Sequence, residues 1–283
     1  MKFYTFFMLA MVFGTVSLAQ NSNADQEEWI QLFNGENLDG WIPKIRGFAA
    51  GENAYETFRV EDGLLQVRYD QYPSFDETFG HLFYDQFFDY YKLKVVYRTV
   101  GEQVANGPGW ALRNNGMMLH CQHPNNMGLN QDFPISIEVQ LLGDDGSGKR
   151  STANLCTPGT NVYYQGQFDT RHCINSTSKT YPHEEWVELE VIVMGDSIVQ
   201  HIMEGEVVME YEKLQVGGGA VNELLPDQKI DGQPLIGGLI SIQAESAPFD
   251  FKTIEVLPLK GCMDPDSPNF RPYYLVNDSE KCK

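Results

Sequence analysis

The chain has 283 residues, 42% of them hydrophobic, and a formal net charge of −19 at pH 7. This length suits one large β domain or two ordinary domains. An acidic surface repels nucleic acid and anionic membranes, so nucleic acid is excluded as a partner and neutral ligands such as sugars are favoured. The charge leaves one alternative open, that it only keeps an exported protein soluble.

The N-terminus has the pattern of a secretory signal peptide. Lys2 precedes an apolar stretch, residues 3–13, and Ser17-Leu18-Ala19 gives the small-x-small pattern that signal peptidase cleaves. The stretch is shorter than the ~20 residues that span a membrane, and no later segment has about 18 uncharged apolar residues. We therefore expect cleavage near Ala19 and a periplasmic or secreted mature protein without a membrane span.

Short alternating runs separated by Gly, Asn, Asp and Pro turns follow along the chain. Residues 58–60 lead into the turn Glu61-Asp62-Gly63 and then into a second run, residues 64–67. Further runs cover residues 91–98, 134–142, 186–194, 198–203, 207–211 and 237–243. Helical periodicity is scarce. Many short strands without crossover helices indicate an all-β fold, an antiparallel sandwich or jelly roll.

Three of the predicted strands carry polar residues on alternate positions, opposite an apolar face. The polar stripes are Met118, His120 and Gln122, then Ser136, Glu138 and Gln140, then Ser241, Gln243 and Glu245. The opposite faces are Met117, Leu119 and Cys121, then Ile137, Val139 and Leu141, then Ile240, Ile242 and Ala244. If the strands are neighbours, the polar face is a groove suited to hydroxyl-rich ligands. The alternative is an ordinary solvated sheet face.

Five cysteines in an exported chain are interpreted first as disulfides. Cys156 and Cys173 flank a polar, Gly-rich segment, and Cys262 and Cys282 bracket the C-terminal tail. Each pair would close a loop of about twenty residues and stabilise the fold by ~3 kcal/mol. Cys121 is left over, and we expect a buried, inert thiol, since reactive thiols need an exposed, electropositive setting.

Several sequence blocks resemble the 3-keto-disaccharide hydrolase domain family, also described as 3-keto-glucoside lyase and 3-keto-2-hydroxy-glucal hydratase. The blocks are residues 29–41 (WIQLFNGENLDGW), 58–65 (FRVEDGLL), 113–120 (RNNGMMLH), 136–142 (SIEVQLL) and 234–254. They occur in the family's order and extend the resemblance over about residues 28 to 258. It implies a concanavalin-like jelly-roll β-sandwich with a role in carbohydrate breakdown.

The sequence departs from the family's pattern at one point. Asn115 is followed directly by Gly116, where the family usually has Asn-Ser-Gly, so Asn114 and Asn115 both remain candidates for the family's asparagine. The tail after residue 260 resembles the disulfide-closed tails of exported bacterial proteins and is expected to be a packing appendage. The predicted organisation is a signal peptide (1–19), one jelly-roll domain (20–260) and this tail (261–283).

The strand around Glu138 argues against ordinary glycosidase chemistry. Laminarinase-type jelly rolls have acidic residues at i, i+2 and i+4 of one strand, which places two carboxylates about 5 Å apart. The corresponding positions here are Glu138, Gln140 and Leu142, with only one carboxylate. A 3-keto sugar needs less, because the ketone acidifies the C2 proton and one base then permits β-elimination of the C1 substituent.

This chemistry suggests roles for particular residues. Glu138 and His120 are the acid/base candidates, and Arg113 could stabilise the enolate. Candidates for binding the sugar are Gln140, Gln122, Asn115, Gln243 and, as a stacking platform, Trp110. No cofactor is certain, although a divalent metal held by His120, Glu138 and a third ligand could replace Arg113.

Structural roles compete with these assignments. Glu138 could pair with Arg113, His120 could be a buried structural residue, and Trp110 could belong to the core. The leading hypothesis is an exported enzyme that cleaves 3-keto-glycosides by elimination and hydration, with net hydrolysis of the glycosidic bond. The alternatives are a non-catalytic carbohydrate-binding module and a surface adhesion or scaffold protein.

Overall fold

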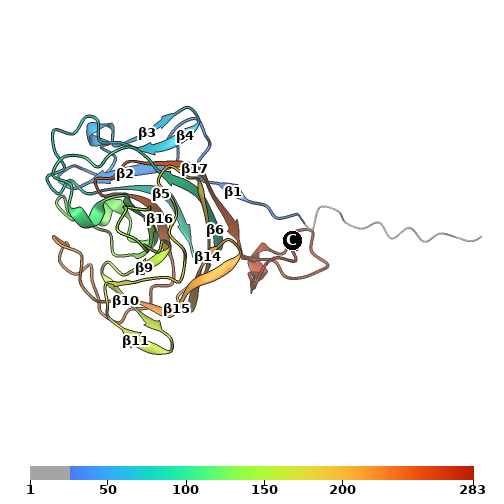
Figure 1. Ribbon diagram of the computed structural model, residues 1–283. Coiled ribbons are helices and arrows are strands. Elements are labelled where there is room, and N and C mark those ends of the chain that lie inside the picture. The colour runs from blue at the N-terminus through green and yellow to red at the C-terminus, as the bar shows by residue number, and fades with distance from the viewer. Residues whose placement is uncertain (1–25) are drawn as a thin grey trace, which may run out of the picture.

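The computed structural model describes residues 26–283, so the predicted signal peptide lies outside the described residues. Two antiparallel sheets pack face to face (Figure 1). The predicted all-β sandwich is therefore confirmed. Within the described residues, no helix is long and apolar enough to cross a membrane.

The larger sheet has ten strands in the order β11-β10-β15-β14-β13-β6-β17-β4-β3, and β1 pairs with β17. Its strands are β1 (Ile30–Gln31), β3 (Phe58–Glu61), β4 (Leu64–Val67), β6 (Tyr90–Thr99), β10 (Thr160–Tyr164), β11 (Gln167–Asp169), β13 (Val187–Met194), β14 (Ile198–Met203), β15 (Glu206–Val216) and β17 (Phe249–Pro258). The consecutive strands β13, β14 and β15 form a meander, whereas β6 and β17 meet from distant parts of the chain.

The smaller sheet has seven strands in the order β12-β9-β8-β7-β16-β5-β2. They are β2 (Trp41–Ile45), β5 (Gly80–Phe88), β7 (Asn114–Cys121), β8 (Ile137–Leu142), β9 (Asn154–Cys156), β12 (Cys173–Ile174) and β16 (Gly238–Ala244). Short 3₁₀ turns are η1 (Ala54–Glu56), η2 (Gly109–Ala111), η3 (Pro124–Asn126) and η4 (Ser279–Lys281). Because β7, β8 and β16 are neighbours, the three predicted polar stripes belong to one sheet.

Alternation of apolar and polar residues builds the core between the sheets. On β6, Leu93, Val95 and Tyr97 are at most 1% exposed, while Lys92 and Lys94 face outward. Burying each such side chain contributes roughly 1.5–3 kcal/mol. On β8 and β16, the predicted inward sets also belong to the core: Ile137, Val139, Leu141, Ile240, Ile242 and Ala244.

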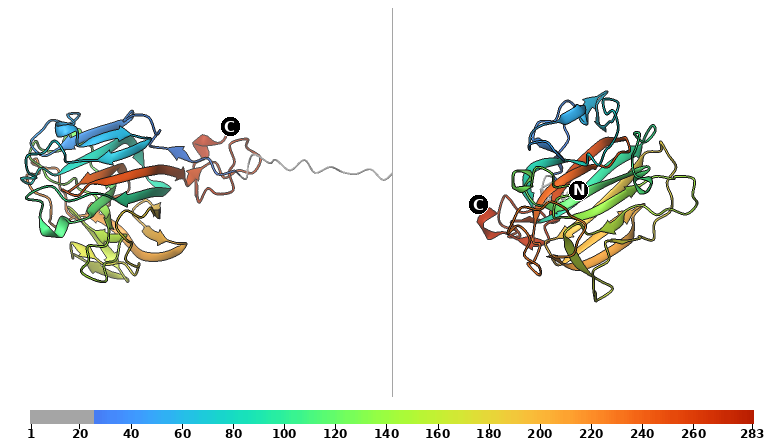
Figure 2. Two further views of the ribbon diagram at one scale, coloured as in Figure 1. Left: turned by 45° about the horizontal axis from the view of Figure 1, so that its top comes forward. Right: turned by 90° about the vertical axis from the view of Figure 1, so that its left-hand side faces the viewer.

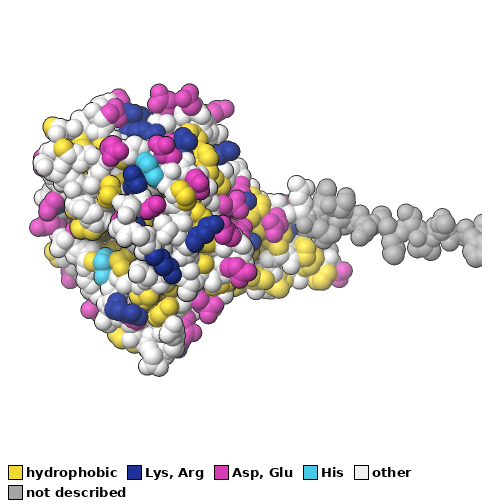
Figure 3. Space-filling view, in the orientation of Figure 1, with side chains coloured by type: hydrophobic (Ala, Val, Ile, Leu, Met, Phe, Trp, Pro, Cys, Tyr) yellow, Lys and Arg dark blue, Asp and Glu magenta, His cyan; other side chains and the backbone are white. Residues whose placement is uncertain are grey.

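One buried charge is part of the larger sheet. Asp250 on β17 is 1% exposed and accepts hydrogen bonds from the guanidinium groups of Arg68 and Arg98. The second arginine lies on β6, directly opposite Asp250 in the strand register. A buried carboxylate is tolerated when it is paired in this way. Elsewhere acidic side chains are spread over the surface with Lys and Arg between them (Figure 3).

The prediction for the faces of β7 is wrong beyond Leu119. His120 has a left-handed φ of 53°, and the pairing of β7 with β16 shifts register between Leu239 and Ser241. A β-bulge of this kind adds one residue and reverses the alternation after it. His120 therefore stays on the core side, and Cys121 changes to the outer face beside Ser241, 3.5 Å from its Oγ to the cysteine Sγ.

The C-terminal tail packs beyond one end of the sandwich (Figure 2). The short strands β18 (Lys260–Gly261) and β19 (Val276–Asn277) pair in parallel, and the predicted Cys262–Cys282 disulfide closes the segment. Arg271 forms an ion pair with Glu28, which joins the tail to the start of the described chain. These contacts agree with a packed appendage.

Candidate active site

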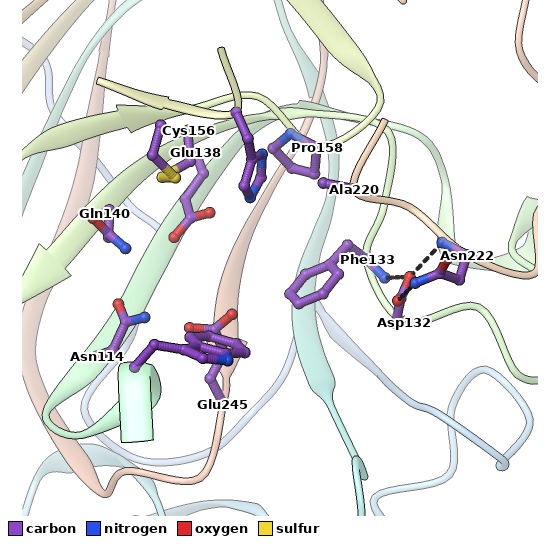
Figure 4. A pocket seen from close by; sticks show the side chains of 13 residues that line it. Asn114, Asp132, Phe133, Glu138, Gln140, Cys156, Pro158, Ala220, Asn222 and Glu245 are labelled. Carbon is purple, nitrogen blue, oxygen red and sulfur yellow. Dashed lines mark hydrogen bonds between the residues drawn. A yellow bond between two sulfur atoms is a disulfide. The ribbon is translucent and has the colours of Figure 1, made fainter. Parts of the chain in front are cut away.

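A cavity of about 380 Å³ opens on the outer face of the seven-stranded sheet. Figure 4 shows side chains from several strands turned toward it: Glu138 and Gln140 from β8, Asn114 from β7 and Glu245 just after β16. The Cys156–Cys173 disulfide, predicted from the sequence, lines the cavity and joins β9 to β12. The polar face of the sheet is thus a pocket.

Glu138 is the central carboxyl group of this pocket. It is 5% exposed, and burial raises its pKa to about 8. Gly116 on the adjacent strand makes room for its side chain, because a Cβ there would be 2.7 Å from Oε1 of Glu138 and 2.9 Å from Oε1 of Gln243. The side-chain oxygens of Glu138 and Gln243 therefore lie close together over Gly116.

Glu245 contributes a second buried carboxyl group. Its side chain is 3% exposed, and Oε2 has no hydrogen-bond partner among residues 26–283. Burial, and then the charge of Glu138, raise its pKa well above the ordinary value. Two carboxyl groups that repel each other in a dry pocket lose their protons one after the other, so a singly charged pair forms first.

Uncharged polar groups surround the two carboxyl groups. Gln140 accepts a hydrogen bond of 3.0 Å from Asn154, whereas Oδ1 of Asn114 has no partner within the described chain. At the mouth, Asp132 accepts hydrogen bonds from the backbone and side-chain nitrogens of Asn222, at 2.8 and 2.6 Å. This pair fixes the loop around residue 222 over one side of the cavity (Figure 4).

Aromatic side chains form another wall. Trp110 is 57% exposed and lines the cavity, and its ring stacks on Phe79 with centroids 6.2 Å apart. Phe133 also lines the cavity and contacts Phe79 at 5.0 Å between centroids. Aromatic faces of this kind suit the apolar faces of sugar rings. The position of Trp110 fits the predicted platform and not a core residue.

The structure brings together only part of the predicted site. Glu138, Gln140 and Trp110 line the cavity, and Gln243 lies beside Glu138 above Gly116. The expectation that His120 shares this cavity is wrong. Its ring faces the core, where Nε2 is 3.1 Å from the carbonyl oxygen of Gly195 and the ring packs against Tyr91.

Three other candidates also lie outside the cavity lining. Arg113 donates to the carbonyl oxygen of Asp144, and Asn115 donates to the carbonyl oxygen of Gln243 within the sheet. Gln122 accepts from the backbone nitrogen of Ile135 and braces the adjoining loop. The sequence left open whether Asn114 or Asn115 is the family's asparagine, and of the two it is Asn114 that lines the cavity.

A metal shared by His120 and Glu138 is inconsistent with their positions, because the two side chains project from opposite faces of the sheet. Within residues 26–283, no group of three or more His, Cys, Asp or Glu side chains is arranged to hold a metal ion.

Glu245 is the functional candidate that the sequence interpretation missed. The laminarinase pattern has both carboxylates on one strand, whereas here the second group comes from the end of β16. The signal was present in the alternation of Ser241, Gln243 and Glu245, which continues the polar face beyond the last strand residue, Ala244.

The fold is a concanavalin-like jelly roll with a polar pocket on the outer face of one sheet. The chain matches the family described as the 3-keto-alpha-glucoside-1,2-lyase-like domain over residues 28–257 and belongs to that family. The resemblance found in the sequence blocks is thereby confirmed. No curated protein matches the chain.

Solved structures with the same fold are distant in sequence. A candidate glycosyl hydrolase from Parabacteroides distasonis is 20% identical, with a TM-score of 0.50, and the match covers 82% of this chain and 94% of that one. A second from the same organism is 16% identical, with a TM-score of 0.48 and coverage of 82% and 100%. The laminarinase from Rhodothermus marinus is 10% identical, with a TM-score of 0.48 and coverage of 83% and 97%.

Proposed function

We propose that the protein cleaves 3-keto-glycosides by β-elimination and hydrates the product, with net hydrolysis of the glycosidic bond. Family membership supports the substrate class. The observation that carries the proposal is that two buried carboxyl groups, Glu138 and Glu245, share one cavity with raised pKa values.

The singly charged pair supplies one base and one acid. Burial raises the pKa of Glu138, whereas burial and also the charge of Glu138 raise the pKa of Glu245, so we assign Glu138 as the base and Glu245 as the acid. It removes the C2 proton, which the C3 ketone acidifies, and the electron pair forms an enolate. The enolate then expels the C1 oxygen, which takes the proton of Glu245, so that an alcohol and a 2-hydroxy-3-keto-glucal are released.

Hydration of the glucal reuses the same groups. After elimination Glu138 holds a proton and Glu245 is ionised, which is the reverse of the starting state. Glu245 can then accept a proton from a water molecule that attacks C1, while Glu138 returns its proton to C2. Both carboxyl groups recover their initial protonation states, and the sum of the two steps is hydrolysis.

The charge on the enolate must be met without a Lys or Arg side chain in the lining, where the basic residue is His172, whose pKa burial lowers. Within the described chain, no Lys or Arg lines the cavity. Neutral N–H donors that are fixed in a dry site can supply this stabilisation. Arg113 remains unsuited to the role, since it is bound to the Asp144 carbonyl oxygen.

Release of 4-nitrophenol from a 4-nitrophenyl 3-keto-glucoside tests the proposal. We expect Glu138→Gln and Glu245→Gln each to lower kcat by about 10²–10⁴-fold. Deuterium at C2 should slow the wild-type reaction. Glu188→Gln, on the opposite sheet with a side chain 57% exposed, is the matched control and should be unchanged. Equal cleavage of the unoxidised glucoside, with no C2 isotope effect, would refute elimination.

A non-catalytic carbohydrate-binding module is the second candidate, and the exposed Trp110 at the cavity mouth favours it. In that case calorimetry would show glycan binding that depends on Trp110, and no aglycone would be released from 3-keto-glucosides. A parallel assay with and without a chelator reveals whether turnover needs a divalent metal.

We also propose that the protein is exported. Two disulfides persist most readily in an oxidising compartment such as the periplasm or the extracellular space. Cell fractionation followed by N-terminal sequencing should find the mature chain beginning near Gln20. A full-length chain in the cytoplasm would contradict this.

A further inference from the structure

A buried histidine that the proposed mechanism does not use lies beside the cavity. His81 on β5 is 0% exposed, and neither ring nitrogen has a hydrogen-bond partner among residues 26–283. Gln243 on the neighbouring strand β16 is also 0% exposed, and within the same residues both atoms of its side-chain amide are unpartnered. Buried polar groups are nearly always paired, so this cluster needs an explanation.

The strand register places these groups on the cavity face. Gln243 is directly opposite His81, and directly opposite side chains on adjacent strands share a face. Oε1 of Gln243 and Oε1 of Glu138 approach the same point above Gly116. The unpartnered amide of Gln243 and the imidazole of His81 therefore extend the polar face of the sheet from Glu138 toward β5.

The Phe133 side chain lies between the cavity and the side chains of His81 and Gln243. Its ring lines the cavity (Figure 4) and packs against the His81 ring, with centroids 5.7 Å apart and planes at 75°. The backbone around it is fixed, because its carbonyl oxygen accepts from Gln131 and its nitrogen donates to the Asp132 carboxylate. Any access from the cavity to His81 therefore depends on the Phe133 side chain and not on its backbone.

The side chains of His81 and Gln243 are uncharged. Lys44, opposite His81 on β2, donates to the carbonyl oxygens of Ile45 and Leu129. Burial, and then the charge of Lys44, lower the pKa of His81 to about 3. A neutral imidazole offers one N–H donor and one acceptor, and the glutamine amide offers both kinds as well. This set is complementary to carbonyl and hydroxyl oxygens, and its N–H donors can also face an oxygen that gains negative charge.

We propose that His81 and Gln243 form an inner subsite that binds the oxygen at C3 of the sugar ring when the Phe133 side chain turns aside. The inference rests on the proposed function, because it places the C2 proton near Glu138 and the C3 oxygen on neutral donors. These donors then stabilise the enolate, for which the described lining offers no Lys or Arg.

Imidazole ¹⁵N spectroscopy of the Glu138→Gln protein tests the contact without turnover. Saturation with methyl 3-keto-glucoside should shift the His81 ring signals. His201 is the matched control: it is equally buried, and its nitrogens are paired with the Ala153 carbonyl oxygen at 2.8 Å and the Tyr211 hydroxyl at 3.0 Å. Its signals should stay in place. Unchanged His81 signals at saturation would overturn the proposal.

Side-chain removal gives a second readout. In the Glu138→Gln background, His81→Phe and Gln243→Leu should each weaken binding of methyl 3-keto-glucoside by about tenfold, while binding of the 3-deoxy glucoside should change little, because it lacks the contacted oxygen. Equal weakening for both ligands, or none for either, would contradict the assignment of the C3 oxygen. Thermal unfolding of each variant reports whether it is folded.

The outcome separates the two proposals. If the C3-dependent binding is found but the wild type releases no aglycone, the subsite stands and the elimination chemistry fails. If the wild type turns over 3-keto-glucosides and neither His81→Phe nor Gln243→Leu alters KM or kcat, the chemistry stands and the subsite fails. Phe133→Ala should speed exchange of the His81 ring N–H with solvent, whereas Phe168→Ala, an exposed aromatic on β11, should not.

Discussion

Glu138 on β8 and Cys156 on β9 are directly opposite each other in the strand register. The disulfide from Cys156 to Cys173 therefore lies beside the carboxyl group and fixes the short strand β12 to the edge of the sheet. His172, the residue before Cys173, lines the same cavity. The covalent bridge thus holds a wall of the pocket in place.

Removing this bridge should affect both stability and binding. The Cys156→Ala, Cys173→Ala double variant is expected to lose about 3 kcal/mol of unfolding free energy and to raise KM for a 3-keto-glucoside. The matched control is the double variant Cys262→Ala, Cys282→Ala, which opens the tail far from the cavity. It should lose stability with unchanged KM. Equal changes in KM for the two double variants would show that the bridge does not support the pocket.

The raised pKa of Glu138 predicts how stability depends on pH. The folded protein holds this proton up to about pH 8, whereas the ordinary value is 4.5. Protonation of Glu138 therefore stabilises the folded state fully below about pH 4.5. This stabilisation is lost as the pH rises from there through 8, by up to ~1.4 kcal/mol per pH unit. Glu138→Gln should remove this part of the fall in denaturant titrations between pH 5 and 9. The exposed Glu188→Gln should keep the wild-type slope, and an unaltered slope in Glu138→Gln would contradict the prediction.

The lack of a side chain at Gly116 allows a steric test of the placement of Glu138 and Gln243. Alanine there would bring a Cβ within 3 Å of the oxygens of Glu138 and Gln243. We expect Gly116→Ala to displace these side chains and lower kcat/KM at least tenfold, with the β-sandwich retained in circular dichroism. Gly219→Ala is the control, since its Cβ would meet nothing within 4 Å. Wild-type kinetics for Gly116→Ala would show that the close placement of the two side chains is dispensable.

Trp110 should contribute to binding and little to folding, because its ring is exposed at the mouth of the cavity. Trp110→Ala is expected to weaken glycan affinity by about 5–30-fold, as for loss of 1–2 kcal/mol of stacking, and to leave the melting temperature nearly unchanged. Trp186→Ala is the control: Trp186 is 39% exposed and packs under Arg98, outside this cavity. A glycan affinity equal to that of the wild type in Trp110→Ala would remove the platform from the site.

The regular strands explain what could be predicted from the sequence. On β8 the apolar and polar residues alternate from Ile137 to Leu141, so the inward set and the outward pair Glu138 and Gln140 followed from the period of two. The five sequence blocks identified the family because they contain the regular strands and turns of the fold.

The failures have local physical causes. The bulge at His120 depends on a left-handed backbone at a non-glycine residue, which no alternation pattern reveals, and it moved His120 into the core. The pairing of Glu138 with Glu245 depends on which strands become neighbours, because the two residues lie on β8 and after β16 with β7 between them. Contacts between such distant segments are a property of topology and not of local sequence.

The bulge in β7 has one further consequence, for the length of ligand that the sheet can hold. Met118 before the bulge and Cys121 after it pack with Phe83, Met127 and Leu239 into a second, smaller apolar cluster. One half of the strand thus borders the cavity, and the other half is covered by apolar side chains. For the proposed carbohydrate ligand, this cluster would block a long chain laid across the sheet, so we expect chain ends and short glycosides to bind.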